Sequence, residues 1–394
     1  MNNKIMFALC GCLLWYSGIS QTTTINDILK QIEQNNQELN ALSELVKSKE
    51  FDLKSSNNLP DPQMGAYQLS SEGNASGDYT EYQISQSIEF PTVYGVRGRL
   101  IKTRTEELSL EFEMKRQEVL AQAKALLINL VFLQKKFLVE STRFKQAEQV
   151  YQQMQVLYQK EEIGIIEMNK AKVVWMQNQF ELDQLSTEIK NLELELKNLN
   201  GGIDFQLALD DYGISKQIET KEAIWQEKQN QDPELRILKQ QEVVAQQSLS
   251  LAKNELLPNL TLGYNSQGVS GERFSGVYTG MSIPLWSNRN KVKSAKSQLY
   301  FQESLSSSKT RELYASFEGL YNTYQTMFLK FQEYERVIAN LNSDELLFKA
   351  YQLGDLSFME YYIELQFFQN AYDEMLHMEQ QLYISQVQLL KHQL

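Results

Sequence analysis

The sequence predicts a mainly α-helical protein with a small β part, in which long antiparallel coiled-coil hairpins are joined to four short strands. Three observations predict this fold class: long stretches without proline, apolar residues in heptads, and a set of motifs that occurs twice. None of the six prolines lies between positions 92 and 232 or after Pro284, and glycine is almost as sparse there. Because proline and glycine break helices most strongly, these stretches predict very long helices.

The heptads support the same conclusion. Two long runs of apolar residues spaced three and four apart extend from Ala123 to Tyr158 and from Leu320 to Phe348, interrupted only by Glu140 and Glu345. A third run is unbroken and consists of Leu182, Leu185, Ile189, Leu192, Leu196 and Leu199. A repeat of 3.5 residues held over this length predicts coiled-coil packing. A helix of about 60 residues would be about 90 Å long.

The motifs that occur twice predict an internal duplication. The segment 158–167 aligns without gaps with 351–360, at an offset of 193 residues, and the same offset aligns Phe90-Pro91 with Ile283-Pro284. Agreement of several elements in one order is the signature of a structural repeat.

The predicted division of the chain follows from this duplication. A first repeat covers 21–200, with a helix, a β-hairpin at 61–90 and a helical hairpin at 92–200 that turns near 161–165. An inter-repeat segment covers 201–231, with a short strand possible after Phe205. The second repeat covers 232–394, with a helix, a β-hairpin at 259–283 and a helical hairpin at 285–394 that turns near 353–357.

The predicted strands alternate between apolar and polar residues. Tyr82, Ile84 and Ile88 share one face of the second strand, while Glu81 and Gln83 share the other. In the second half Leu260, Leu262, Tyr264, Val277 and Met281 match the apolar side. Alternation over about 10 residues is typical of outer-membrane strands, and an ordinary half-buried hairpin of a soluble protein shows it as well. Trp286, just after the last strand, is a candidate anchor at a membrane boundary, and burial against neighbouring helices is the alternative.

The N-terminus predicts export. Lys4 is followed by an apolar run from Ile5 to Trp15 and by small residues at Gly18 and Ser20, so residues 1–20 read as a cleaved signal peptide. A second interpretation makes Cys12 a lipidated N-terminus. Both cysteines lie in this segment, so the mature chain is expected to have no disulfide. After this segment the sequence contains no run of about 18 apolar residues, so no membrane-spanning helix is predicted.

Composition and motifs argue against several classes of function. A formal charge of −12 disfavours nucleic-acid binding, which needs clustered Lys and Arg. No phosphate-binding loop is present, and the only histidines are His377 and His392, so we expect no enzyme and no cofactor. Met375, His377 and Met378 could bind a soft metal ion, but methionine at helical spacing is usually core packing, and no metal site is predicted.

Taken together, the signal peptide, the duplicated hairpins and the turn motifs resemble the TolC-type outer-membrane efflux proteins over essentially the whole mature chain. The segments Leu59-Pro-Asp-Pro-Gln63 and 86–94 are similar to the heavy-metal branch of that family, the CzcC and CusC type. The resemblance implies a homotrimer in the outer membrane, with a twelve-stranded transmembrane β-barrel in contact with lipid and a long periplasmic extension. It also implies a periplasmic adaptor and a proton-driven inner-membrane pump as partners, and passive export of metal cations or other toxic small molecules.

The resemblance also assigns site residues at the two helical turns. Glycine lets a chain reverse between antiparallel helices, so Gly164 and Gly354 are expected at the periplasmic tips. The residues expected to contact the adaptor are Glu162, Ile163, Gly164, Gly354, Asp355, Leu356 and Ser357. By the same resemblance, Glu360 and Glu364 are expected to ring a closed periplasmic mouth, where crowding would raise carboxyl pKa values. The alternative for Glu360 is a solvated position inherited with its counterpart Glu167.

A periplasmic coiled-coil adaptor or structural protein of an export complex is the competing function. Such proteins normally have one helical hairpin between β-rich domains. The two hairpins and four strands predicted here fit that architecture poorly.

Overall fold

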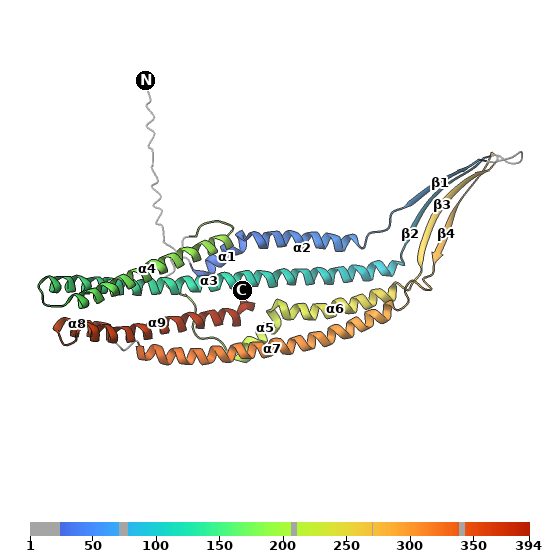
Figure 1. Cartoon of the computed structure of the whole chain (residues 1–394). Coiled ribbons are helices and arrows are strands. Elements are labelled where there is room, and N and C mark those ends of the chain that lie inside the picture. The colour runs from blue at the N-terminus through green and yellow to red at the C-terminus, as the bar shows by residue number, and fades with distance from the viewer. Residues whose placement is uncertain (1–23, 71–77, 206–210, 270, 339–342) are drawn as a thin grey trace, which may run out of the picture.

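The computed structural model describes residues 24–70, 78–205, 211–269, 271–338 and 343–394. The predicted signal peptide, with Cys10 and Cys12, lies outside these residues. Over the described residues the protein is an elongated bundle of long helices with one small sheet at one end (Figure 1). The predicted class, mainly helical with four strands, is therefore confirmed.

The first half of the chain contributes four helices. They are α1 (Ile25–Asn35), α2 (Gln37–Ser55), α3 (Pro91–Gln159) and α4 (Ile165–Leu199). Asn36 separates α1 from α2, and its side chain accepts a hydrogen bond from the backbone N–H of Leu39, which caps the start of α2. With 69 residues, α3 is about 100 Å long, in the range that the missing prolines predict.

The second half contributes the remaining helices. They are α5 (Lys221–Gln231), α6 (Pro233–Asn254), α7 (Lys291–Ile338), α8 (Ser343–Leu353), α9 (Phe358–Leu389) and a short 3-10 helix (Lys391–Gln393). Helix α5 lies in the segment for which the sequence suggested only a strand after Phe205, and 206–210 are outside the described residues. Thr220 caps α5 by accepting from the N–H of Ala223. Trp225 of α5 packs against Tyr314 and Phe317 of α7.

Helix α7 begins later than expected, at Lys291 rather than near 285. Asn290 has a φ of 68°, a left-handed conformation that a helix interior does not contain. The side chain of Asn288 also binds the backbone carbonyl of Glu255, which ties the start of α7 to the end of α6. The chain between Pro284 and Lys291 therefore turns before it becomes helical.

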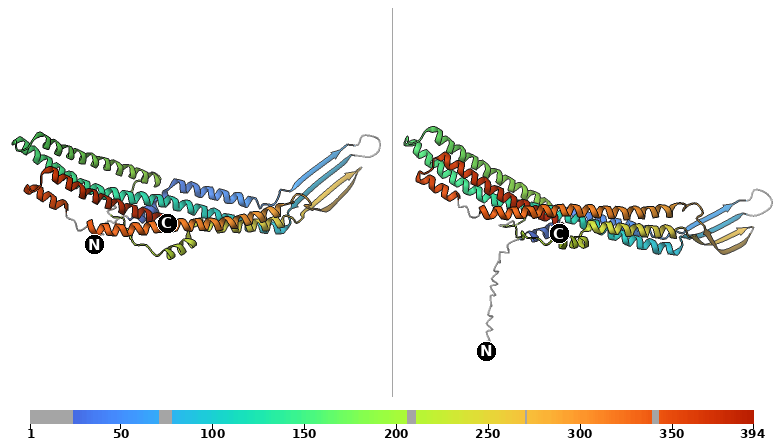
Figure 2. Two further views of the ribbon diagram at one scale, coloured as in Figure 1. Left: turned by 60° about the horizontal axis from the view of Figure 1, so that its bottom comes forward. Right: turned by 90° about the horizontal axis from the view of Figure 1, so that it is seen from below.

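The sheet consists of β1 (Gln63–Leu69), β2 (Tyr79–Ile88), β3 (Asn259–Val269) and β4 (Glu272–Ser282). All neighbours are antiparallel, in the order β1-β2-β3-β4, so β2 and β3 join the two halves of the chain. Figure 2 shows the sheet extending beyond the ends of the helices, with β1 and β4 as its two edges.

The register separates the two faces of the sheet. Ile84 lies opposite Met64 and Tyr264, and Tyr264 lies opposite Val277, so these apolar residues share one face. That face is solvent-accessible in the single chain, with 76% exposure at Val277. The predicted apolar alternation is thus confirmed for β2, β3 and β4.

The other face of the sheet is polar. Asn265 donates to Glu81 at 2.6 Å, and Gln83 bonds the hydroxyl of Tyr278. Tyr278 lies across Gly263, where an added Cβ would come within 2.2 Å of the ring. Glycine is therefore needed at position 263 for the aromatic side chain to lie flat on this face.

Helix packing is concentrated in three apolar clusters. One lies mid-bundle between α1, α3, α4 and α9, one at the end of the bundle opposite the sheet, and one between α5, α7 and α9. Among the described helices none is both long and apolar enough to cross a membrane.

Candidate functional site

The two helical turns lie side by side at the end of the bundle opposite the sheet. One turn joins α3 to α4 and the other joins α8 to α9 (Figures 1 and 2). Val150, Met154, Phe358 and Tyr361 bury an apolar cluster between the two hairpins just behind the turns. This cluster fixes the positions of the turns relative to one another.

Both turns end their first helix in the same way. The N–H of Glu162 donates to the carbonyl of Leu157 at 2.9 Å, and the N–H of Asp355 donates to the carbonyl of Ala350 at 3.0 Å. The residue before each donor is left-handed, with φ of 61° at Glu161 and 79° at Gly354. This is the Schellman arrangement, in which a left-handed residue turns the next N–H back onto the last helical turn.

The expectation for the first glycine was therefore wrong in its mechanism. Gly164 has a φ of −80° and a ψ of 158°, an extended conformation open to any residue. Glu161 reverses the chain in the first turn, and Gly354 has this function in the second. Gly164 instead stands at the N-cap of α4, as Ser357 does for α9.

Each returning helix begins with a glutamate that binds back to its N-cap residue. The N–H of Gly164 donates to Glu167 at 3.3 Å, and the N–H of Ser357 donates to Glu360 at 2.9 Å. Ser357 also accepts from the N–H of Glu360 through its hydroxyl, which completes a capping box. Hydrogen bonding to Ser357, through its side chain first and its backbone second, lowers the pKa of Glu360.

The expected tip residues differ in exposure. Ile163 and Leu356 are half-buried and pack against the apolar cluster. Glu162, Gly164, Gly354, Asp355 and Ser357 are exposed. The two apolar positions therefore anchor the turns, while the polar and glycine positions form the outer surface.

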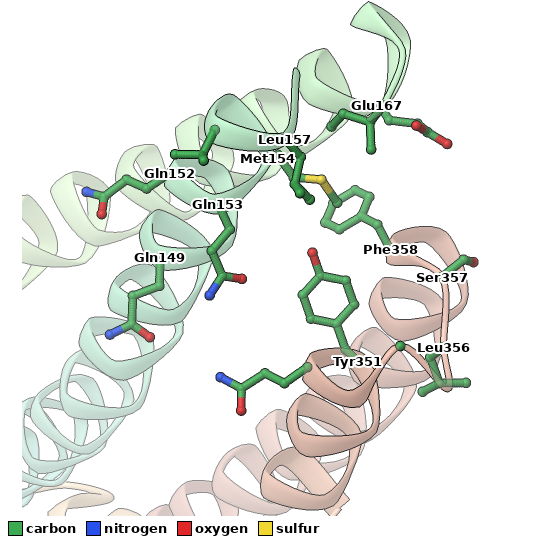
Figure 3. A pocket seen from close by; sticks show the side chains of 14 residues that line it. Gln149, Gln152, Gln153, Met154, Leu157, Glu167, Tyr351, Leu356, Ser357 and Phe358 are labelled. Carbon is green, nitrogen blue, oxygen red and sulfur yellow. The ribbon is translucent and has the colours of Figure 1, made fainter. Parts of the chain in front are cut away.

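Between the two turns is a groove open to solvent (Figure 3). Its apolar floor includes Met154, Leu157, Tyr351 and Phe358, and Phe358 points toward Met154 across the gap. Its polar wall is formed by Gln149, Gln152 and Gln153 of α3. An apolar floor beside amide side chains suits a peptide or helix surface better than a charged small molecule.

Glu360 and Glu364 are both exposed and lie one helical turn apart on α9. Neither forms an ion pair with another described residue. In the single chain the pKa of Glu360 is lowered by its capping hydrogen bonds, whereas the expected crowding would raise it.

A buried ion cluster joins the two hairpins further up the bundle. The guanidinium of Arg143 on α3 donates to both carboxylate oxygens of Asp373 on α9 at 2.9 Å, and to Glu140. Arg143 is 7% exposed and Glu140 is 5% exposed, and burial raises the pKa of Glu140. In the sequence Glu140 interrupts a heptad of apolar residues, and a charged residue at such a core position is the signal that indicates a buried ion cluster.

A segment from 211 to 220 crosses the middle of the bundle and adds a second ion cluster. Lys216 binds Glu379 of α9 at 2.8 Å and Glu335 of α7 at 3.1 Å, while Lys135 of α3 binds Glu379 at 3.1 Å. The hydroxyl of Tyr383 donates to the backbone carbonyl of Ile214 at 3.1 Å. The segment thus connects three long helices at one level.

Comparison with solved structures relates this architecture to membrane channels. No family model matches the sequence, and a search of curated proteins finds no match. The structure of CusC, described for transmembrane channel formation, has a TM-score of 0.76 at 12% identity over 94% of this chain and 91% of its own. The VceC outer-membrane protein of Vibrio cholerae has a TM-score of 0.73 at 10% identity, over 93% of this chain and 95% of its own. The chain has the TolC-type outer-membrane channel fold.

A third example is the CmeC outer-membrane channel of Campylobacter jejuni, with a TM-score of 0.67 at 16% identity over 100% of this chain and 93% of its own. The TolC-type fold therefore accounts for helices and sheet together. Because CusC and VceC match almost equally well, the likeness does not favour the heavy-metal branch.

Proposed function

We propose that this chain is a subunit of an outer-membrane channel in a tripartite efflux system, and that it forms a passive export duct across the periplasm and the outer membrane. The observation that carries the proposal is an open four-stranded sheet with one exposed apolar face at the end of a helical bundle about 100 Å long. The likeness to solved outer-membrane channels over nearly the whole chain supports it. A transport component of this kind needs no catalytic residue.

The proposed assembly is a homotrimer with a twelve-stranded barrel. The edge strands β1 and β4 each leave unpaired N–H and carbonyl groups, which lipid does not tolerate. Four strands are too few for a barrel, whose usual minimum is eight, and the TolC-type fold favours three chains. Exposed apolar side chains on different helices also favour contacts between chains. They include Val173, Met176 and Phe180 on α4, and Leu329, Ile363 and Phe367 on α7 and α9.

An internal duplication accounts for the paired turns. Glu161 and Gly354, Ile163 and Leu356, and Glu167 and Glu360 are each 193 residues apart and have matching positions in the two turns. We infer that the two halves, 21–200 and 232–394, derive from one ancestral unit joined by 201–231.

The turn end is the proposed docking surface for a periplasmic adaptor, which would connect the channel to a proton-driven inner-membrane pump. The exposed residues of both turns and the groove between them support this placement. The proposed cargo is metal cations or other toxic small molecules. A deletion strain that keeps normal tolerance to copper, silver and zinc but becomes sensitive to dyes would favour organic compounds.

Glu360 and Glu364 are the proposed gate residues at the periplasmic mouth. Their exposure on one face of α9 is compatible with three copies of each side chain around a common axis. Single-channel currents of a Glu360→Gln, Glu364→Gln double variant in a planar bilayer test this proposal. Unaltered conductance, cation preference and divalent block would exclude these residues as a gate.

The membrane location is tested by a charge on either face of the sheet. Ile84 lies on the exposed apolar face, and Ser85, its neighbour along β2, lies on the polar face. A Lys at the lipid-facing midplane of a barrel costs about 2–4 kcal/mol, whereas a lumen position tolerates it. We expect Ile84→Lys to abolish recovery of folded protein from outer membranes, and Ser85→Lys to be recovered normally. Equal recovery of both variants would contradict a transmembrane sheet.

A further inference from the structure

A groove between α7 and α9, in the middle of the bundle, is lined by side chains with soft donor atoms. His377 and Met378 come from α9, and Met327 comes from α7 on the opposite wall. Glu374 of α9 lies on the same groove. Imidazole nitrogen and thioether sulfur are ligands that favour monovalent copper and silver over hard cations such as Mg²⁺ or Ca²⁺.

A chain of hydrogen bonds determines which nitrogen of His377 is free. The amide nitrogen of Gln380 donates to Oδ1 of Asn129 on α3 at 2.8 Å, so the amide oxygen of Gln380 is the atom that faces His377. That oxygen lies 3.1 Å from Nδ1 of His377 and can only accept, so Nδ1 must have the hydrogen. When the imidazole is neutral, Nε2 then has a free lone pair.

This arrangement is the one that metal-binding histidines use, in which one ring nitrogen binds the ion and the other donates to a neighbouring oxygen. Among the described residues Nε2 of His377 has no hydrogen-bond partner. The orientation of the ring is therefore set by Asn129 and Gln380 before any ion binds.

The two thioethers are held by packing. Met327 and Met378 are half-buried and contact the aromatic cluster formed by α5, α7 and α9. Partial burial restricts these flexible side chains and reduces the conformational entropy that an ion would have to remove. Met375 packs against the same cluster but does not line the groove, so the packing interpretation of the sequence holds for that residue.

The charge around the groove does not oppose a cation. Lys330 lines it but forms an ion pair with Glu333 of its own helix at 3.0 Å. The carboxylate of Glu374 adds a negative charge on the wall formed by α9. The remaining lining residues are the neutral side chains of Asn322, Thr323, Thr326 and Gln381.

We propose that this groove binds one soft monovalent cation, Cu(I) or Ag(I), through Nε2 of His377 and the thioether sulfurs of Met327 and Met378. Gln380 is a positioning residue that acts through the imidazole. The proposal goes beyond the export function, because it requires a binding site in each chain and does not require that the ion is the exported cargo.

The test is a titration with Ag(I), which needs no reductant. The protein is purified in detergent with Cys10→Ser and Cys12→Ser, so that any chain that retains its N-terminal segment has no thiolate, because thiolates bind silver strongly and would mask the site. Isothermal titration is expected to show one Ag(I) per chain, and X-ray absorption is expected to show a mixed nitrogen and sulfur shell. Replacing His377 with Ala, or Met327 and Met378 with Leu, should remove this binding, while circular dichroism and particle mass stay unchanged.

Two matched variants separate a built site from scattered methionine binding. Met375→Leu removes a thioether that packs beside the site but does not line the groove, and it should bind Ag(I) as the parent does. Gln380→Leu should weaken binding about 10–100-fold, the usual effect of losing a hydrogen-bond partner of a metal-binding histidine, and Gln380→Glu should restore it. Binding that is absent in the parent, or unchanged in the His377 and Met327/Met378 variants, would overturn the proposal.

Discussion

Glu360 illustrates how one residue can be read in two ways. Its place at the start of α9 made it a candidate gate, and the structure adds a local function, because Ser357 and Glu360 form the capping box of that helix. Arg143 and Glu140 show the opposite case, because no sequence motif marks them as a pair and yet both are buried between two hairpins. Both cases lead to predictions for single residues.

The capping function of Glu360 predicts a pH-dependent stability. Because the pKa of Glu360 is lowered below 4.5 in the folded chain, the ionised carboxylate contributes stability above pH 4.5, and this contribution is lost as the pH falls through the lowered folded pKa. We expect Glu360→Gln to melt at a lower temperature than the parent at neutral pH, and the difference to shrink as the pH falls below 4.5. Melting curves across this pH range check it. Glu364→Gln is the control, since Glu364 lies one turn further on and caps nothing; an equal, pH-dependent loss there would argue against the capping explanation.

The ion cluster at Arg143 predicts a strongly asymmetric response to mutation. Arg143→Met leaves Glu140 buried without its cationic partner and Asp373 without the guanidinium nitrogen that donates to both of its oxygens, and should destabilise each chain by about 3 kcal/mol. Replacing all three with apolar residues of similar size should cost much less, because no uncompensated charge remains. Denaturant midpoints of the two variants provide the measurement. A triple variant as unstable as Arg143→Met would show that the ion pairs themselves are required.

At the scale of elements, the two turns reach one geometry with different residues. A left-handed position after a helix costs a non-glycine residue about 1 kcal/mol, a cost that Glu161 bears and Gly354 avoids. The sequence locates both turns, but its motif points to Gly164 as the reversing residue, because glycine is the residue type that most readily adopts a left-handed conformation. The last residues of the helix determine which position must be left-handed. The turn motif in the sequence does not specify that helix end to the exact residue.

Three substitutions distinguish the two turns. Glu161→Gly should stabilise the protein by about 1 kcal/mol, and Gly354→Ala should destabilise it by a similar amount. Gly164→Ala should destabilise the protein less than Gly354→Ala, because its backbone is extended and the new methyl group enters open space, so that only the N-cap preference for glycine over alanine is lost. Thermal unfolding of the three variants checks the order. A larger effect at Gly164 than at Gly354 would contradict the conclusion that Glu161, and not Gly164, reverses the chain in the first turn.

At the scale of the whole molecule, the sheet is incomplete by itself. One chain supplies four strands and two unpaired edges. The backbone N–H and carbonyl groups of its helices, in contrast, are paired mainly within each helix. We therefore expect β1 of one chain to pair with β4 of another, and proximity of these two strands is the quantity to measure.

Cysteine cross-linking tests this association. In the Cys10→Ser, Cys12→Ser chain, we combine Met64→Cys on β1 with a cysteine on β4 at Val277, Thr279 or Met281, all on the same face of the sheet. Two strands separate β1 from β4 within one chain, a distance of about 14 Å, which no disulfide spans. We expect at least one pair to give covalent dimers and trimers, that is, species with two and three times the mass of one processed chain. Monomer alone for every pair, with protein recovered from outer membranes, would contradict pairing of β1 with β4 between chains.

The sequence by itself determined the long helices, the four strands and the two faces of β2, because these depend on breakers and periodicities that act over neighbouring residues. It also placed both turns to within a few residues. Only the tertiary structure revealed that Arg143 meets Asp373, that Gln380 orients His377, and that Met327 and Met378 face one groove while Met375 does not. Arg143 and Asp373 are 230 positions apart, and Asn129, which holds the amide of Gln380, is 251 positions from it. The packing of α3, α7 and α9 that brings such residues together leaves no local pattern in the chain.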